Sequence, residues 1–361
     1  MLCLCSCMRT EQDLFKLIDK TKTISNNYTE IIQSRLDNLT KPLGSLGLLE
    51  EFVKKLGNIQ ETVSPKIKKK RVYVFASDHG ITQERVSAYP SSVTAQMVLN
   101  FLKGGASINV LAQQFNVEVK VVDVGVNYDF LDVPNIIERK IAKGTKNFLL
   151  EPAMTREQAL KSIFIGIELA KQSKEDQVDC LVPGDMGIGN TTPSSAITSL
   201  ICKKPVEEVT GKGTGLSDEG LQHKVKVLKR TLETRKVNLD DPLNILSQVG
   251  GFEIGAIAGL ALGCSYYNIP LIADGFISTT GIALGTCFSS KVKDIVFPSH
   301  SSLEKGHSHL LQFLNLRPVL NLDMRLGEGT GGVLAVALLE SAINLYNNMA
   351  TFESAGVDKR E

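Results

Sequence analysis

A single carboxylate, Glu328, stands between glycines in the segment MRLGEGTGG (324–332), directly before a long apolar run. The apolar run predicts a buried helix, so Glu328 lies at or just before a helix N-terminus. An acid at that place is commonly a helix cap. In a site closed from water, however, desolvation raises the pKa of a carboxyl and makes it usable as a general base near neutral pH. Flanking glycines would let a flat substrate approach, and the residues alone leave both interpretations open.

A glycine-rich segment, GDMGIGNTTPSSA (184–196), follows a predicted strand and opens a predicted helix. Its free N–H groups and the positive end of the helix dipole favour an anion, most simply a phosphate. Asn190, Thr191 and Thr192 add hydrogen-bonding side chains. The segment matches neither a P-loop nor the dinucleotide fingerprint. A tight turn without a ligand is the alternative.

A second glycine-rich loop, GKGTG (211–215), is followed by Lys224. A glycine loop with a lysine suits a phosphate or phosphoribosyl group, although helix surfaces commonly carry lysines and the signal alone is weak. Two such loops in one sheet protein favour a sugar phosphate substrate.

The histidines suggest metal ligation at first sight. They are His79 in SDHG and His300, His307 and His309 in SHSSLEKGHSH. No HExxH motif and no regular Cys/His pairing accompanies them, and no G-x-S-x-G elbow supports a serine hydrolase. We therefore expect no metal site.

Short apolar runs alternate with helical patterns along the chain. The runs are VYVFASD (72–78), VEVKVVDVGV (117–126), DCLVPGD (179–185) and IPLIADG (269–275). This alternation predicts an α/β fold with a Rossmann-like, mainly parallel sheet covered by helices on both faces. Ligands of such folds bind at the carboxyl ends of the strands, which here are rich in Gly and Asp.

Three helix signals are specific enough to test. Ser45 is expected to cap the helix in SLGLLEEFVKKLG and Gly57 to end it. Thr155 and Gln158 have capping-box spacing. The segment GFEIGAIAGLALGCSYY (251–267) predicts a small-residue helix that packs close to the sheet.

Composition narrows the class of protein. Among 361 residues, 40 Lys and Arg balance 39 Asp and Glu, which argues against a nucleic-acid partner. The basic run KIKKKR (66–71) is interpreted as a solvated lead-in to a strand rather than as a polyanion site. Apolar segments are broken too early for a membrane span of roughly 20 residues. The seven cysteines form no disulfide framework, so we expect a cytoplasmic protein with a disordered lead-in over residues 1–10.

Several of these segments, in order, resemble the family of nicotinate-nucleotide:5,6-dimethylbenzimidazole phosphoribosyltransferases, which build the lower nucleotide loop of cobalamin. The matching motifs are RLDNLTKPLGSLG (35–47), SDHGITQERVSAYPSSVTAQMVLNFLKGGASINVL (77–111), GDMGIGNTT (184–192), GKGTGL (211–216), ADGFIS (273–278), SHSSLEKGH (299–307) and MRLGEGTGG. The family transfers the phosphoribosyl group of nicotinate mononucleotide to the benzimidazole with inversion, giving α-ribazole 5′-phosphate and nicotinate.

The resemblance implies roles for individual residues. The family's catalytic glutamate corresponds to Glu328, which would take the proton from the benzimidazole. The base pocket would use Ser87, Gln96 and Leu326. The phosphoribosyl group would be held by Asp185, Gly187, Gly189, Asn190, Thr191, Gly211, Gly213 and Lys224. The family usually has glutamate at the position of Asp185, so the carboxylate here is one methylene shorter.

The resemblance also implies an architecture and partners. A large Rossmann-like domain would span residues 66–332, a small helical domain would combine residues 11–65 with 333–361, and the protein would be a homodimer. The substrates would be nicotinate mononucleotide and 5,6-dimethylbenzimidazole, without a cofactor, a nucleic acid or a membrane. Two alternatives remain: transfer to another base, such as a purine or a phenol, or a non-catalytic binding protein for α-ribazole or a related nucleotide. Intact Glu328 and Lys224 argue against the second.

Overall fold

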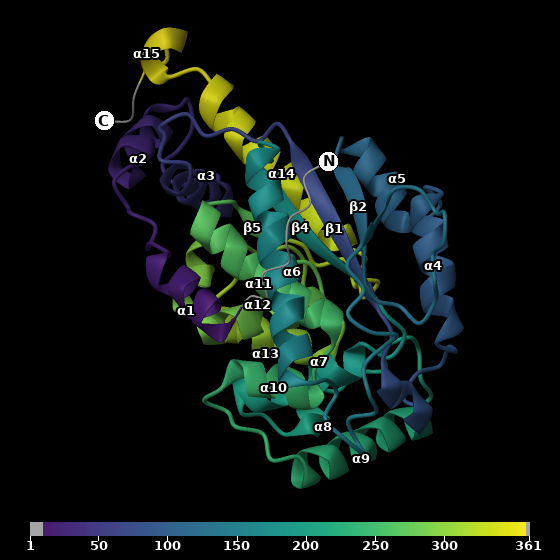
Figure 1. The fold of residues 1–361 in the computed structure, drawn as a ribbon. Helices are drawn as coiled ribbons and strands as arrows, with labels where there is room; N and C mark the ends of the chain where they lie inside the picture. The colour runs from purple at the N-terminus through teal and green to yellow at the C-terminus, as the bar shows by residue number, and fades with distance from the viewer. Residues whose placement is uncertain (1–9, 359–361) are drawn as a thin grey trace.

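The protein is built around one six-stranded parallel sheet with strand order β3-β2-β1-β4-β5-β6 (Figure 1). The computed structural model describes residues 10–358, so residues 1–9 of the lead-in expected over residues 1–10, with Cys3, Cys5 and Cys7, lie outside the described residues. Thr10 itself is ordered as the cap of the first helix. The strands are β1 (Lys70–Ser77), β2 (Glu118–Gly125), β3 (Ile136–Glu138), β4 (Cys180–Met186), β5 (Leu271–Ile272) and β6 (Val296–Phe297). The predicted α/β class with a parallel sheet is confirmed.

Strand β1 lies between β2 and β4 and is buried along its whole length. Its Val74 is paired with Val121 of β2 and Gly184 of β4. The chain moves to one side of β1 through β2 and β3 and to the other side through β4, β5 and β6, so the strand order reverses between β1 and β4. A ligand crevice is expected outside the carboxyl ends of these two strands.

Helices cover both faces of the sheet. One face carries α6 (Arg156–Glu175), α11 (Phe252–Tyr267) and α12 (Phe276–Phe288). The other face carries α4 (Ser92–Leu102), α5 (Ser107–Gln114) and α14 (Thr330–Asn348). Beyond the carboxyl ends lie η1 (Gly80–Glu84), α7 (Thr191–Cys202), α8 (Val206–Val209), α9 (Asp218–Thr234), α10 (Pro242–Val249) and α13 (Lys305–Leu314), several of which form the lower part of Figure 1. The short η2 (Ser290–Ile295) leads directly into β6 and lies at the amino end of that strand.

Small residues bring α6 and α11 into close contact. A Cβ added at Gly259 would lie 1.8 Å from Ile163 O, and one added at Gly166 would lie 1.9 Å from Ala256 O. The predicted small-residue helix is therefore confirmed: it packs on the sheet, while its glycines allow the close approach of α6. The predicted capping box of α6 is also present, with Thr155 Oγ1 accepting from Gln158 N.

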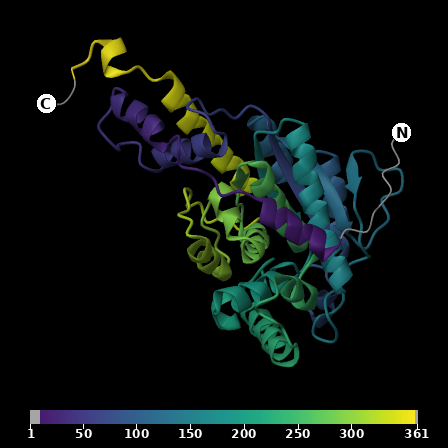
Figure 2. The same ribbon diagram turned by 60° about the vertical axis from the view of Figure 1, so that its left-hand side comes forward.

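Helices from the two end regions of the chain meet beside the amino ends of the strands. Helices α2 (Thr29–Asn38) and α3 (Leu48–Ile59) pack together, and α3 packs on α14, as the turned view in Figure 2 makes visible. The short α15 (Phe352–Ala355) follows α14. Ser45 does not cap α3, whose N-cap is Gly47, and Gly57 does not end it, because the helix continues two residues further and packs Gly57 against Ile32.

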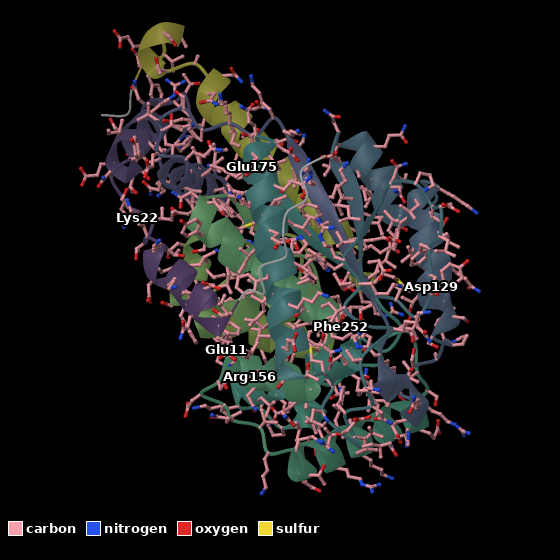
Figure 3. The ribbon with its side chains drawn as sticks, in the orientation of Figure 1. Glu11, Lys22, Asp129, Arg156, Glu175 and Phe252 are labelled. Atoms are coloured by element: carbon pink, nitrogen blue, oxygen red, sulfur yellow. The ribbon has the colours of Figure 1, made fainter. Side chains whose placement is uncertain are left out.

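Helix α1 (Glu11–Lys20) lies apart from α2 and α3 and contacts α11. An exposed cluster of charges fixes it to the N-terminus of α6. Arg156 binds Glu11 through Nε and Nη2 at 2.6 and 2.8 Å and Asp241 through Nη1 at 2.6 Å (Figure 3).

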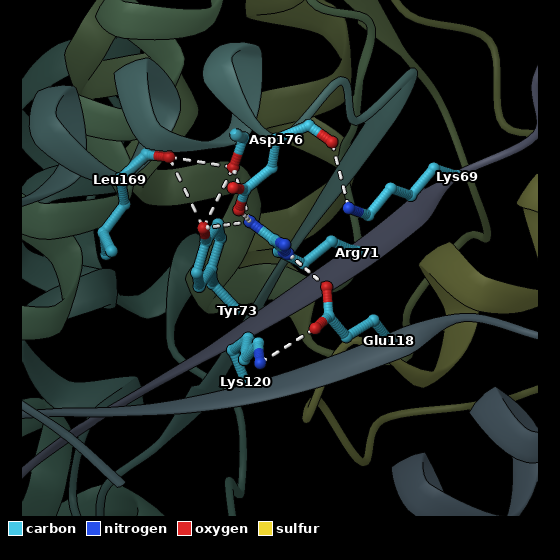
Figure 4. A network of polar contacts seen from close by, with 8 residues as sticks. Lys69, Arg71, Tyr73, Glu118, Lys120, Leu169 and Asp176 are labelled. Carbon is cyan, nitrogen blue, oxygen red and sulfur yellow. Dashed lines mark hydrogen bonds and ion pairs between the residues drawn. The ribbon is translucent and has the colours of Figure 1, made fainter. Parts of the chain in front are cut away.

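The basic run before β1 is not fully solvated, which corrects the sequence interpretation. Lys70 and Arg71 belong to β1 and are 6% and 3% exposed. Arg71 binds Glu118 at 2.6 Å and Asp176 at 2.8 Å, and Nη1 donates to Tyr73 OH at 3.0 Å (Figure 4). Burial of Arg71 is possible because its charge finds partners on β2 and at the end of α6. Among residues 10–358, no helix is long and apolar enough to cross a membrane.

Candidate active site

The loops that follow β1 and β4 are pressed together where the strand order reverses. A Cβ added at Gly187 would lie 2.3 Å from Ser77 O, and one at Gly189, where φ is +91°, would lie 2.6 Å from Thr82 Cγ2. Only glycine fits both positions without displacing the loop after β1. The loop then opens helix α7 at Thr191, as the sequence predicts, so the helix N-terminus faces the carboxyl ends of the strands.

Glu328 occupies a turn of three consecutive residues with left-handed backbone. The φ angles of Gly327, Glu328 and Gly329 are +81°, +63° and +95°. A left-handed conformation is uncommon for a glutamate and is held only by its surroundings. The turn lies on β4: a Cβ added at Gly184 would be 2.3 Å from Glu328 O.

The Glu328 carboxylate does not cap the helix that follows it. Helix α14 has Gly329 as N-cap and no side-chain cap of its own, whereas Glu328 Oε2 accepts a hydrogen bond of 3.2 Å from Ile108 N at the start of α5. Glu328 is 5% exposed. Burial raises the pKa of its carboxyl above the ordinary value, the Ile108 hydrogen bond lowers it in part, and the charge of Asp274 raises it further.

Asp185 adjoins the Glu328 turn from the end of β4. Its Oδ2 accepts from Asn190 Nδ2 at 2.9 Å, and its Oδ1 is buried without a hydrogen bond, 3.1 Å from where a Cβ would stand at Gly327. Burial raises the pKa of Asp185 well above its ordinary value, and Asp274, Glu253 and Glu328 add to this effect. A buried carboxyl oxygen without a partner is available to a ligand.

Lys224 joins the two glycine-rich loops. Its Nζ donates to Thr191 Oγ1 at 2.7 Å and lies 3.5 Å from Gly211 O, and a Cβ at Gly213 would lie 3.5 Å from the same Nζ. The side chain is fully buried. Burial lowers the pKa of Lys224 to about 8, although the charge of Glu304 acts to raise it. A lysine at a helix N-terminus between glycine loops is suited to a phosphate.

The three residues expected to form the base pocket are more exposed than the carboxylates and the lysine described above. Ser87 Oγ lies 3.1 Å from Thr214 Oγ1, so the segment after β1 contacts the second glycine-rich loop. Gln96 is exposed on α4, and Leu326, two residues before Glu328, is 55% exposed. The structure therefore places Asp185 beside the Glu328 turn and joins the two glycine-rich loops through Lys224, whereas Gln96 and Leu326 are open to solvent.

Four residues around the site were not predicted from the sequence to belong to it. Asp274, after β5, accepts from Gly329 N at 3.1 Å and from Gly332 N at 2.8 Å. His79, considered above only as a metal ligand, has Nε2 3.0 Å from Glu253 Oε1, both side chains being fully buried beneath the first glycine-rich loop. Glu304 packs on Gly211. Asp274 and His79 do stand at the polar strand ends ADG and SDHG, so position after a strand was the available signal.

The histidines near the site have partners other than metal ligands. His307 Nε2 lies 3.0 Å from Thr279 Oγ1, and burial lowers the pKa of its ring to about 3. His300 Nδ1 lies 3.1 Å from Ser299 Oγ. Over the part of the chain that the structure describes, no group of three or more His, Cys, Asp or Glu residues could hold a metal ion.

A parallel sheet with two glycine-rich loops, a buried lysine and a buried carboxylate beyond its carboxyl ends suits an enzyme that transfers a phosphorylated sugar. Comparison with known proteins agrees: the sequence model of a family described as Phosphoribosyltransferase matches residues 21–357. The chain belongs to this phosphoribosyltransferase family and is an enzyme of that family.

Individual relatives and a solved structure show which members of the family the chain is similar to. The chain is 51% identical over 325 residues to the nicotinate-nucleotide–dimethylbenzimidazole phosphoribosyltransferase of Geobacter sp. (strain M21), covering 90% of this chain and 93% of the relative. It is 45% identical over 342 residues to the protein of the same name from Chlorobaculum tepidum, covering 95% and 97%. The crystal structure of CobT from Thermus thermophilus superposes with a TM-score of 0.88 at 42% identity, covering 92% of this chain and 99% of that one.

Proposed function

We propose that this protein transfers the 5-phosphoribosyl group of nicotinate mononucleotide to 5,6-dimethylbenzimidazole, releasing nicotinate and α-ribazole 5′-phosphate for the nucleotide loop of cobalamin. One ring nitrogen of the benzimidazole forms a bond to ribose C1 while the bond from C1 to the pyridinium nitrogen of nicotinate breaks. Attack from the opposite face inverts C1. The proton on the other benzimidazole nitrogen passes to Glu328.

The main support for this proposal is the environment of the Glu328 carboxylate. Its carboxylate is buried, bound by one backbone N–H of α5, and withdrawn from the N-terminus of its own helix. A carboxylate used as a cap would be engaged by two or more N–H groups and would be a weak base. Burial instead raises the pKa of Glu328, which favours proton uptake during the reaction. Gly327 and Gly329 carry no side chains that would hinder a flat ring beside the carboxylate.

The phosphoribosyl end is supported by charge and backbone. The loop at Gly187 and Gly189, the N-terminus of α7 and the ammonium of Lys224 converge on one region. Because these groups are fixed before binding, little ordering is needed when the phosphate arrives. No metal is required in principle, since nicotinate leaves from a bond in which its ring nitrogen is already cationic.

The identity of the acceptor base is supported by fewer contacts in the structure than the phosphoribosyl site. Gln96 and Leu326 are exposed, and Ser87 is engaged with Thr214. An open base pocket is compatible with a different flat acceptor, so transfer to a purine or a phenol is the second candidate. It would leave the roles of Glu328 and Lys224 unchanged.

We further propose the assembly and location that the family resemblance implies. The protein would be a homodimer, with a large domain over residues 66–332 and a small helical domain over residues 11–65 and 333–361. Leu303, Leu322 and Leu326 are each more than half exposed near the site, which supports coverage by a second copy. Cys180, Cys202, Cys264 and Cys287 are unpaired thiols, which supports a reducing, cytoplasmic location. Light scattering on the purified protein tests the dimer.

The direct test is a mass-spectrometric assay of the purified protein with nicotinate mononucleotide and a panel of bases that includes 5,6-dimethylbenzimidazole. We expect free nicotinate and α-ribazole 5′-phosphate. A larger kcat/KM with a purine or a phenol would replace the acceptor. Nucleotide binding without a product from any base would favour the non-catalytic binding protein.

A further inference from the structure

The turn that carries Glu328 is anchored by one buried side chain from another strand. Asp274 Oδ2 accepts from Gly329 N at 3.1 Å, and its Oδ1 accepts from Gly332 N at 2.8 Å. These N–H groups belong to the N-cap and first turn of α14, the groups that a capping acid would normally satisfy. Asp274, which is far from Glu328 in the sequence, therefore does the capping that Glu328 does not.

The surroundings of Asp274 offset the cost of its charge. Burial raises the pKa of its carboxyl, while the ring of His300 and backbone N–H groups that include Gly275 N act to lower it. His300 packs directly on the first turn of α14, since a Cβ at Gly331 would lie 2.0 Å from its Nδ1. Asp274 is 1% exposed, so solvent does not screen it. Hydrogen bonds from several backbone groups favour the ionised carboxylate even where burial opposes the charge.

The charged groups around Glu328 come from several elements. Asp185 faces it from the end of β4 and Asp274 from the end of β5, while His300 lies behind Asp274 after β6. The N-terminus of α5 approaches from the other face through Ile108 N. Of these groups, Asp274 alone both acts on the charge of Glu328 and holds its backbone.

We propose that Asp274 is a positioning residue for Glu328: its carboxylate fixes the left-handed turn at residues 327–329 and places a negative charge beside the Glu328 carboxyl. The role of Glu328 in transfer rests on the proposed function. The effect of Asp274 on the carboxyl of Glu328 does not, because it can be measured in the free protein.

Two substitutions separate charge from geometry. Asp274→Asn removes the charge and leaves only one oxygen to accept hydrogen bonds. Without the neighbouring charge, Glu328 binds its proton less tightly, so the acid limb of kcat/KM moves to lower pH. Displacement of the turn lowers kcat by about 10- to 100-fold. Asp274→Glu keeps the negative charge, but its side chain is one methylene too long for the space that Asp274 fills. We therefore expect kcat to fall while the acid limb of the pH profile of kcat/KM stays close to that of the unmodified protein.

A matched control is Asp123→Asn. Asp123 is also fully buried at a strand end and accepts from two backbone N–H groups, Gly125 and Val126, at 3.0 and 2.8 Å. It lies on β2, its Oδ2 is 2.8 Å from Lys140 Nζ, and it makes no hydrogen bond to the Glu328 turn. A loss that came only from removing a buried capping carboxylate would be common to both variants, whereas the shift of the acid limb is expected for Asp274→Asn alone. The substrates titrate identically in every assay, so only differences between variants count.

A second readout needs no turnover. Carboxyl resonances of protein labelled with ¹³C-glutamate are titrated, and the Glu328 resonance is assigned by its loss in Glu328→Gln. Its midpoint is expected to fall in Asp274→Asn and to stay in Asp274→Glu and Asp123→Asn. An unmoved midpoint in folded Asp274→Asn overturns the inference. If that variant does not fold, a midpoint that moves in Asp274→Glu overturns it. If the unmodified protein does not transfer the phosphoribosyl group, the proposed function is contradicted. The titration would still decide whether Asp274 acts on the Glu328 carboxyl, because it needs no turnover.

Discussion

Lys224 Nζ donates a hydrogen bond of 2.7 Å to Thr191 Oγ1, and this contact joins α7, the helix that follows β4, to α9, the helix that follows the second glycine-rich loop. The two loops are well separated in the sequence, the first ending at residue 191 and the second beginning at residue 211, and nothing in their spacing fixes how they meet. The lysine is buried between them, so a phosphate bound there would meet a desolvated ammonium. Charge-assisted hydrogen bonds are strongest in such surroundings.

Binding of nicotinate mononucleotide should weaken as the pH rises from about 7 to about 9. The pKa of Lys224 is lowered to about 8, so its ammonium is largely charged at the lower pH and largely neutral at the higher one. The phosphate remains a dianion over this range, since its second pKa is about 6. Lys224→Met should raise Kd about 10- to 100-fold at neutral pH and flatten the pH dependence. Calorimetric titration measures both. Lys226→Met, on the same helix, is the control, and an equal loss there would contradict the assignment.

Glu328→Gln should lower kcat by about 100- to 10,000-fold, the usual contribution of a general base. Glutamine keeps the size of the side chain and can still accept from Ile108 N, so the Kd for nicotinate mononucleotide should hold. Because the carboxyl must be ionised to take a proton, and burial raises its pKa, activity of the unmodified protein should fall on the acid side and this limb should vanish in the variant. Steady-state assays over pH provide the comparison. A variant with unchanged kcat would remove the general-base role.

Asp185→Glu should preserve or raise kcat/KM. Asp185 Oδ1 is buried without a hydrogen bond, so the present side chain leaves one oxygen unused near Glu328. The glutamate side chain is one methylene longer and would bring the carboxyl group closer to the ligand. The family resemblance implies this geometry, because the family usually has glutamate at this position. The assay compares both proteins with 5,6-dimethylbenzimidazole and with the other bases of the panel. A lower kcat/KM with every base would mean that the shorter carboxylate is matched to this site.

Sequence patterns predicted the parts of the molecule that depend on local residues. Apolar runs indicated β1, β2, β4 and β5, and glycines leading into a helix indicated the loop before Thr191, whereas the short edge strands β3 and β6 were not predicted. Contacts between distant segments were beyond such reasoning. The sequence leaves open whether Glu328 is a helix cap or a base. In the structure Asp274 accepts the hydrogen bonds from Gly329 N and Gly332 N at the N-terminus of α14, so Glu328 is not needed as a cap. The exposure of Gln96 likewise depends on how α4 lies against the sheet, which no local spacing encodes.

The basic run at residues 66–71 shows the same limit, because its charges look alike in the sequence and differ in the fold. Arg71 has a side chain only 4% exposed, and its carboxylate partners are Glu118 and Asp176, from β2 and the end of α6. Arg156 also binds two carboxylates, but its side chain is 43% exposed. The two arginines therefore form a matched pair, each with two acidic partners at similar distances and with very different access to water.

Replacing each arginine by methionine should separate burial from pairing. Arg71→Met removes the contacts of a buried guanidinium with Glu118, Asp176 and Tyr73, although Glu118 keeps Lys120 at 2.8 Å. The two carboxylates are each 36% exposed, so the free energy of unfolding should fall by about 1–3 kcal/mol. Arg156→Met breaks a solvent-screened cluster and should cost about 1 kcal/mol or less. Urea unfolding at low salt and at about 1 M salt measures both, and salt should reduce only the smaller loss. Equal losses in the two variants would mean that the contacts of Arg71 are no stronger than a surface ion pair.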